Sequence, residues 1–184
     1  MWVSNGGIPD TIPGARTNHD FAPVPLNNGV VFVGENDSVG EELFYTDGTT
    51  VSLVEDFTPG TDETYFYDVI GYNNKVYFSS YSQTYNQEVL HVYDGINPID
   101  TVTTQLRPQK ILVVNGILYV EGTDSHYAQE LYMIDGNHPL ALVVDVNPNG
   151  SSVNKTVPYW WNGMLYFSAN DGTHGEELWA YDPN

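Results

Sequence analysis

Three loops of the sequence carry closely spaced oxygen-bearing side chains that could hold a metal ion. They lie at 35–42, 121–126 and 170–177, and each combines Asp, Asn or Glu with at least one glycine. Oxygen-rich loops with a central glycine can wrap Ca²⁺. The carboxylates that would bind it are Asp37, Glu41, Asp124, Asp171 and Glu176. None of the loops has the spacing of an EF-hand, so the first interpretation is a polar turn, whose side chains bond their own backbone. Calcium is the alternative, and no cofactor is required.

Two histidines accompany these loops. His126 and His174 occupy roughly equivalent positions, which would put them on the same face of a repeating structure, and they are candidate ligand-binding residues. The sequence contains no pair of the His-Glu-x-x-His type that would indicate a catalytic zinc site. A third histidine, His91, stands where other copies of the repeat described below have an aromatic residue, so we expect it to be packed.

Trp160 and Trp161 are the remaining candidates for ligand binding. Alternation along a strand would turn one ring inward and the other toward a neighbouring element or an outer face. An exposed aromatic ring can stack on a sugar, which makes a glycan site one interpretation. The other interpretation is that both rings pack between repeats.

Catalytic signatures are absent from the sequence. There is no Gly-x-Ser-x-Gly, phosphate-binding loop or dinucleotide fingerprint. Carboxylates are abundant, but Glu42, Glu130 and Glu177 recur at one repeat position, which favours a structural role. We therefore expect a protein that is not an enzyme, with a hydrolase as the weakest alternative.

The elements that must position these residues are four copies of a repeat of roughly 45 residues. An Asn-rich turn precedes an apolar strand at 28–33, 73–78, 115–120 and 162–167. A Glu-Leu-aromatic strand ending in Asp follows each at 42–48, 89–95, 130–136 and 177–183. Prolines at 13, 59, 108 and 148 form a third landmark. Asn-Gly and Asp-Gly between apolar runs are strong hairpin signals, so each copy is predicted to hold four short strands.

Units of this size with four strands predict an all-β fold, a four-bladed β-propeller of four-stranded antiparallel blades. The predicted blades are 21–64, 65–108, 109–150 and 151–184. The third landmark is missing from the last copy and occurs instead at Asp10–Gly14. Residues 1–14 are therefore predicted to close the ring as the outer strand of the last blade, with 1–20 forming the closing strand and its link. Closure would remove an open sheet edge.

The amino-acid composition of the chain limits the classes of partner that it could bind. The chain has 184 residues, 24 Asp and Glu against 5 Lys and Arg, and a formal net charge of −19. Such a surface repels nucleic acid and anionic membranes. No apolar run of membrane-spanning length occurs, so no membrane insertion is expected. The absence of cysteine excludes disulfides and thiolate zinc sites.

Residues 167–179, and also 142–148, resemble the ELWxxDGT (hyalin-like) repeats of secreted bacterial proteins. The last copy matches closely, the first and third moderately, and the second is degenerate at 79–89. Asp182 is followed by Pro183 rather than Gly-Thr. The resemblance implies a propeller-like module that is secreted, extracellular or at the cell surface, and it carries over no catalytic residue.

Together these observations predict a non-catalytic extracellular module for interaction, adhesion or surface assembly. Its partner would be a protein, a glycan or further copies of itself. A carbohydrate-binding lectin is the alternative function.

Overall fold

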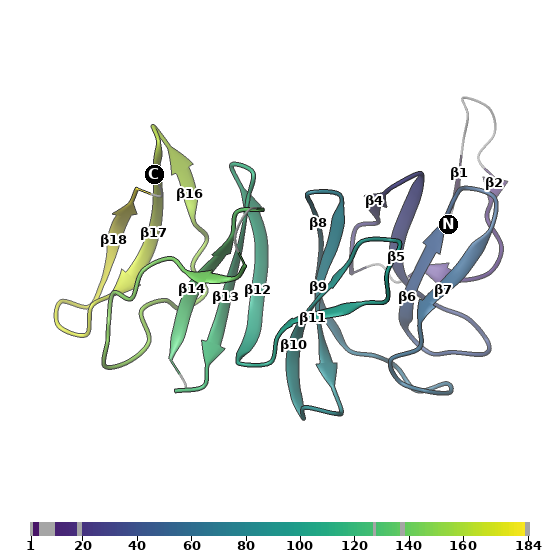
Figure 1. Ribbon diagram of the computed structural model, residues 1–184, viewed down its shortest axis with the longest axis horizontal. Helices are drawn as coiled ribbons and strands as arrows, with labels where there is room; N and C mark the ends of the chain where they lie inside the picture. The colour runs from purple at the N-terminus through teal and green to yellow at the C-terminus, as the bar shows by residue number, and fades with distance from the viewer. Residues whose placement is uncertain (1, 4–9, 18–19, 127, 137–138, 183–184) are drawn as a thin grey trace.

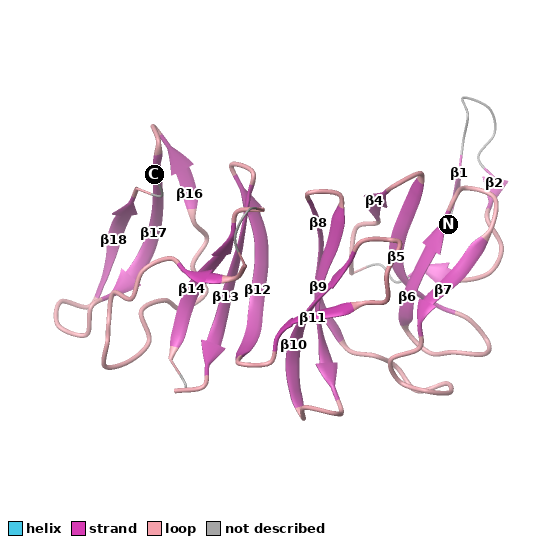
Figure 2. Cartoon of the chain, in the orientation of Figure 1, coloured by secondary structure: helices cyan, strands magenta, loops and turns pink. Residues whose placement is uncertain are grey.

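The protein is an all-β structure. The computed structural model describes residues 2–3, 10–17, 20–126, 128–136 and 139–182, and this part of the chain forms strands and no helix (Figure 2). No described segment could therefore cross a membrane as a helix. Four antiparallel sheets contain nearly all of the strands, and a short hairpin of β1 (Trp2–Val3) and β2 (Asp10–Thr11) precedes them.

Each of the four sheets is built from strands that follow one another in the chain. The first contains β4 (Val24–Leu26), β5 (Gly29–Glu35), β6 (Glu42–Thr46) and β7 (Val51–Glu55), and β3 (Arg16–Thr17) pairs with the far end of β5. The second contains β8 (Phe66–Tyr72), β9 (Lys75–Ser82), β10 (Gln87–Tyr93) and β11 (Asp100–Thr103). The third contains β12 (Leu106–Val114), β13 (Ile117–Asp124), β14 (Gln129–Ile134) and β15 (Ala141–Leu142). The fourth contains β16 (Tyr159–Trp161), β17 (Met164–Asn170) and β18 (Glu176–Tyr181).

The sheets stand side by side in an open row, with the first sheet at one end and the fourth at the other (Figure 1). The predicted ring closure is wrong for the part of the N-terminal segment that the structure describes. Asp10–Thr11 pairs with Trp2–Val3, and Arg16–Thr17 pairs with Glu35 and Gly34. Residues 1 and 4–9 lie outside the described residues. The segment contacts the repeat that follows it directly, a pairing that closes a far shorter loop than one with the last sheet would.

In each of the four sheets, a hairpin turn that begins with asparagine joins two successive strands. The first residue of the turn is Asn27, Asn73, Asn115 or Asn162, and all four have φ between 48° and 54°. Asparagine tolerates this left-handed conformation better than most residues. The first turn is Asn27–Asn28, because Leu26 pairs with Gly29. It therefore lies one residue before the Asn28-Gly29 turn predicted from the sequence.

The proline landmark also differs from the expectation in one copy. Pro108 was assigned to the end of the second repeat, but it lies within β12, the first strand of the third sheet. The register shifts between Pro108 and Lys110. A β-bulge accommodates a residue that cannot donate a ladder hydrogen bond.

The two faces of each sheet have separate roles, because side chains alternate along a strand. We call the face turned toward the next sheet in the chain the leading face, and the opposite one the trailing face. On the leading face, Val31, Tyr77 and Tyr119 occupy one repeat position and belong to the first, second and third inter-sheet cores in turn. The trailing faces of the next sheets supply Phe78, Val120 and Phe167 to the same three cores.

A fourth cluster covers the outer, trailing face of the first sheet. Phe32 and Phe44 stack there with ring centroids 5.8 Å apart, and only 2% and 1% of their surfaces are exposed. Ala15 packs against them, Ile12 is buried, and Gly14 lies against Val51. The N-terminal segment thus covers this end of the row.

This packing predicts the effect of a truncation. Deleting residues 1–15 removes the cover from Phe32 and Phe44, and burial of each such ring contributes about 1.5–3 kcal/mol. We expect the free energy of unfolding to fall by about 3 kcal/mol or more, measured by urea unfolding. The substitution Arg16→Ala is the control, because it breaks exposed ion pairs and leaves the apolar contacts in place. Equal stability of the truncated and full chains would contradict the covering role.

A second prediction concerns His91, which is packed as the sequence suggested. Its ring stacks on Phe78 at 5.1 Å and lies 5.6 Å from Phe57. Burial lowers the pKa of His91 to about 4. A depressed histidine pKa gives stability that is present above pH 6.5 and is lost as the pH falls toward 4, which amounts to about 3 kcal/mol.

The equivalent residues in other copies are aromatic, so His91→Phe should fit and remove this loss. The test is to measure the free energy of unfolding of wild type and of His91→Phe between pH 7 and pH 4. Parallel curves for the two proteins would show that His91 does not titrate with folding.

Candidate functional site

Trp160 and Trp161 point to opposite faces of the last sheet. Both lie on β16, where Trp160 pairs with Leu165 and Trp161 with Met164. Trp160 packs into the core shared with the third sheet. Trp161 is 61% exposed on the leading face, and its ring lies 6.1 Å from that of Tyr166. The alternation expected from the sequence is confirmed, and only Trp161 is available to a ligand.

Other apolar side chains lie on the same face of the last sheet as Trp161. Tyr159 is 68% exposed and pairs with Tyr166, while Leu178 is 75% exposed and pairs with Ser168. We call the apolar part of the leading face of the last sheet the end face, and it consists of Tyr159, Trp161, Met164, Tyr166 and Leu178. Ser168, Asn170, Glu176 and Ala180 lie on the same face of this sheet.

Sequence reasoning found one member of the end face and missed the rest. The signal was present in the repeat, because Tyr166 occupies the position of Tyr119, and Leu178 that of Leu131. Tyr119 and Leu131 are fully buried against the last sheet. The same residue types are therefore core in one sheet and surface in the last.

The two loop histidines each pair with an aspartate of their own loop. His174 Nδ1 lies 2.7 Å from Asp171 Oδ2, and His126 Nδ1 lies 3.5 Å from Asp124 Oδ2. The neighbouring carboxylate raises the pKa of His174. Hydrogen bonds from the backbone and ring of His174 and from the backbone of Thr173 lower the pKa of Asp171 to about 2. These contacts stabilise the loops.

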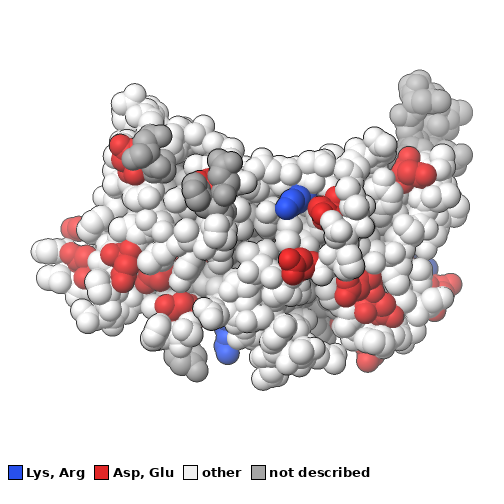
Figure 3. Space-filling view, viewed as in Figure 1, with Lys and Arg blue, Asp and Glu red and all other residues white. Residues whose placement is uncertain are grey.

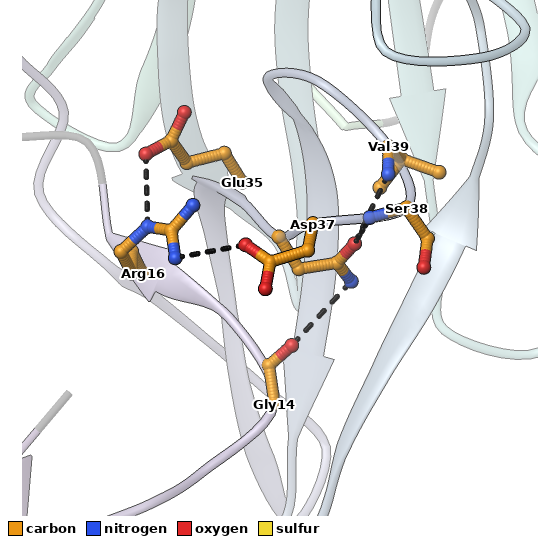
Figure 4. A network of polar contacts seen from close by, with 7 residues as sticks. Gly14, Arg16, Glu35, Asp37, Ser38 and Val39 are labelled. Atoms are coloured by element: carbon orange, nitrogen blue, oxygen red, sulfur yellow. Dashed lines mark hydrogen bonds and ion pairs between the residues drawn. The ribbon is translucent and has the colours of Figure 1, made fainter.

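The candidate metal ligands are engaged in similar local contacts. Asp37 Oδ1 lies 3.2 Å from Arg16 Nη1, and Asn36 beside it accepts the backbone N–H groups of Ser38 and Val39 (Figure 4). Glu176 accepts a hydrogen bond from Ser168 Oγ at 2.8 Å. In the third loop, Asp124 accepts the backbone N–H groups of His126 and Ala128.

The backbone carbonyl of Glu41 accepts the N–H of Thr64. Within the described residues, no three His, Cys, Asp or Glu side chains are placed to hold one metal ion. These contacts are those of polar turns.

Buried glutamates connect the first and third sheets to the loops that lead to the next sheet. Glu42, on the third strand of the first sheet, accepts hydrogen bonds from the backbone N–H groups of Phe57 and Thr58 and from Thr64 Oγ1, at 3.2, 3.1 and 2.7 Å. Glu130, at the same repeat position in the third sheet, accepts the N–H of Ser152. The structural role expected for this repeat position is present in both sheets, whereas Glu177 is exposed.

Glu121 is a further buried carboxylate that sequence reasoning missed. It lies on β13, faces the fourth sheet and accepts the backbone N–H of Lys155. Only 1% of its surface is exposed. Burial is the main cause that raises the pKa of Glu42, Glu121 and Glu130, and the hydrogen bonds oppose it. A carboxylate at a strand position gave no sequence signal of burial, because its partners come from the following loop.

The surface around these sites is acidic. Asp and Glu side chains are spread over the visible face, and very few Lys or Arg side chains interrupt them (Figure 3). The end face differs, because its five members are apolar or aromatic, and Glu176 is the charged residue on the same face of β17 and β18.

Comparisons with known proteins assign no family. No protein-family model and no curated protein matches the chain. Among solved structures it is similar to the uncomplexed acylaminoacyl peptidase of Pyrococcus horikoshii, with a TM-score of 0.49 and 12% identity. The match covers 90% of this chain and 26% of the peptidase chain. A likeness at this level carries neither a family nor an activity to the protein.

The buried glutamates predict a pH effect with a definite sign. Because the folded-state pKa of Glu42 is raised, the stability that it contributes is present below its unfolded pKa and is lost as the pH rises through the folded one. The glutamine side chain of Glu42→Gln is uncharged at every pH, so this variant lacks that pH-dependent contribution. The Tm of wild type minus that of Glu42→Gln should therefore fall by at least about 2 °C between pH 4 and pH 7.

Glu177→Gln provides the matched control, since it changes the same repeat position where the side chain is exposed. Its Tm should follow that of wild type throughout. If the Tm of wild type minus that of Glu42→Gln instead rises with pH, the hydrogen bonds to the Glu42 carboxylate outweigh the cost of its desolvation.

Proposed function

We propose that the protein is a non-catalytic interaction module that binds a partner through the end face. The observation that carries the proposal is the exposure of Trp161 and Leu178 at 61% and 75%. Their counterparts in the preceding sheet, Val114 and Leu131, pack into an inter-sheet core. Contiguous exposed apolar surface rimmed by polar residues is typical of interaction sites.

The acidic surface and the repeat resemblance favour a place outside the cell, in the medium or at the cell surface. A net charge of −19 keeps the rest of the molecule soluble and concentrates adhesion on the uncharged end face. Each sheet corresponds to one copy of the internal sequence repeat. The closed ring is not part of the proposal, because the N-terminal segment pairs with the first sheet.

Carbohydrate binding is the second candidate function, and one observation favours it. Tyr159 and Trp161 are two residues apart in β16, so their rings lie on the same face of the sheet, and both are exposed. Such rings are able to stack on the apolar faces of sugars. A lectin would use the same surface for a different class of partner.

Adhesion through the end face predicts binding of a neutral apolar dye. Nile red fluorescence should rise with dilute wild-type protein and fall at least threefold with the double substitution Tyr159→Lys and Leu178→Lys. Ile96→Lys is the control, since Ile96 is 82% exposed in a loop away from this sheet. Equal fluorescence from all three proteins would refute the end face as the adhesive surface.

A glycan array distinguishes the second candidate. Binding to a defined glycan that Trp161→Ala abolishes would support the lectin, because that substitution removes an indole ring that is 61% exposed. No binding to any glycan would exclude the lectin and leave a protein partner.

A further inference from the structure

The outer faces of the first and last sheets differ in whether other residues cover them. At the first sheet, the N-terminal segment covers Phe32 and Phe44, which are almost completely buried. At the fourth sheet, nothing in the described part of the chain covers the end face. The row therefore has one covered end and one open end.

The open end has the chemistry of an interior face. The three preceding leading faces place Val31, Tyr77 and Tyr119 in cores between sheets, and Tyr166 is the fourth member of that series. Sheets that pack face to face lie about 10 Å apart and bury such residues between them. Within the molecule such a face is thus covered three times, each time by the trailing face of another sheet of the same repeat.

The size of the end face suits a protein partner. Tyr159, Trp161 and Leu178 alone expose on the order of 400 Å², against about 800 Å² per partner in a standard interface. Half-buried Met164 and Tyr166 lie between them on the same face. Two such surfaces in contact would form an apolar core with a polar rim.

The covered end restricts how copies can meet. A head-to-tail stack would need the trailing face of the first sheet, and that face already packs against Ile12, Gly14 and Ala15. Of the two outward sheet faces at the ends of the described row, the end face of one copy therefore finds only another end face uncovered. Contact between identical patches is two-fold and closes after two copies.

We propose that the protein forms a two-fold dimer in which the end faces of two copies pack against each other. The inference rests on the proposed function and names the partner of that surface, a second copy of this chain. Because each copy carries a net charge of −19, repulsion opposes the contact at low ionic strength, and added salt screens it. Association should therefore strengthen with salt.

Sedimentation velocity over a dilution series, in low and high NaCl, tests the dimer. Wild type should convert from a species of 20.5 kDa to one of twice that mass, at a protein concentration that falls at least threefold in high salt. Tyr159→Lys with Leu178→Lys should stay monomeric, and the control Ile96→Lys should dimerise as wild type does. Trp161→Lys provides a second variant, and circular dichroism confirms that each variant is folded.

Wild type that stays monomeric at the highest concentration and salt would overturn the dimer. If the same protein still binds Nile red through the end face, the adhesive function stands and only the choice of partner is wrong. A ladder of species beyond the dimer would also overturn the proposal, because it would require a head-to-tail contact. Dimerisation that survives both lysine variants would place the contact elsewhere.

Discussion

The packing of one sheet's leading face on the next sheet's trailing face is the interaction on which the rest of the structure depends. A four-stranded antiparallel sheet of short strands is marginal by itself, and it becomes stable when an apolar face is covered. Here the inner sheets have both faces covered, so the second and third contribute residues to two cores each. The order of the sheets in space follows directly from their order in the chain.

That arrangement makes the ends of the row its critical points. The first sheet has no predecessor, and the chain solves this with its own N-terminal residues, which lie over a pair of stacked phenylalanines. The last sheet has a leading face with the same pattern of residues and no such cover within the described residues. Solubility then depends on the acidic surface around this exposed apolar face.

Much of the fold could be predicted from local signals. The Asn turns and the Glu-Leu-aromatic strands located the hairpins, since positive φ and period-two alternation are properties of short segments. The first turn was placed one residue late because Gly29 makes Asn28-Gly29 the stronger turn signal, whereas the strand pairing selects Asn27–Asn28. The end of the second repeat was misplaced because Pro108 is tolerated at a bulge inside a strand.

The features that sequence reasoning missed all depend on distant neighbours. The match of Asp10–Gly14 to a repeat landmark suggested a ring, but a composition match cannot tell which sheet the segment contacts. Tyr166 and Leu178 are the same residue types as buried Tyr119 and Leu131, and only the absence of a covering sheet exposes them. For the tryptophan pair, alternation along one strand was enough to place the two rings on opposite faces, but it could not tell which face is left uncovered, and the interpretation that both rings pack between repeats is wrong for Trp161.

The buried glutamates give the row its rigidity at the joints. Glu42 and Glu130 extend from the third strand of one sheet to the backbone of the loop that carries the chain to the next. Glu42 accepts two adjacent backbone N–H groups and Glu130 accepts one, so each carboxyl holds the start of its linker against the sheet. Under a pulling force along the row, such joints would have to break before neighbouring sheets could separate. Resistance to such a force would therefore differ from one junction to the next, because the linkers after the first and third sheets carry this contact and the second sheet has Val89 at the equivalent position.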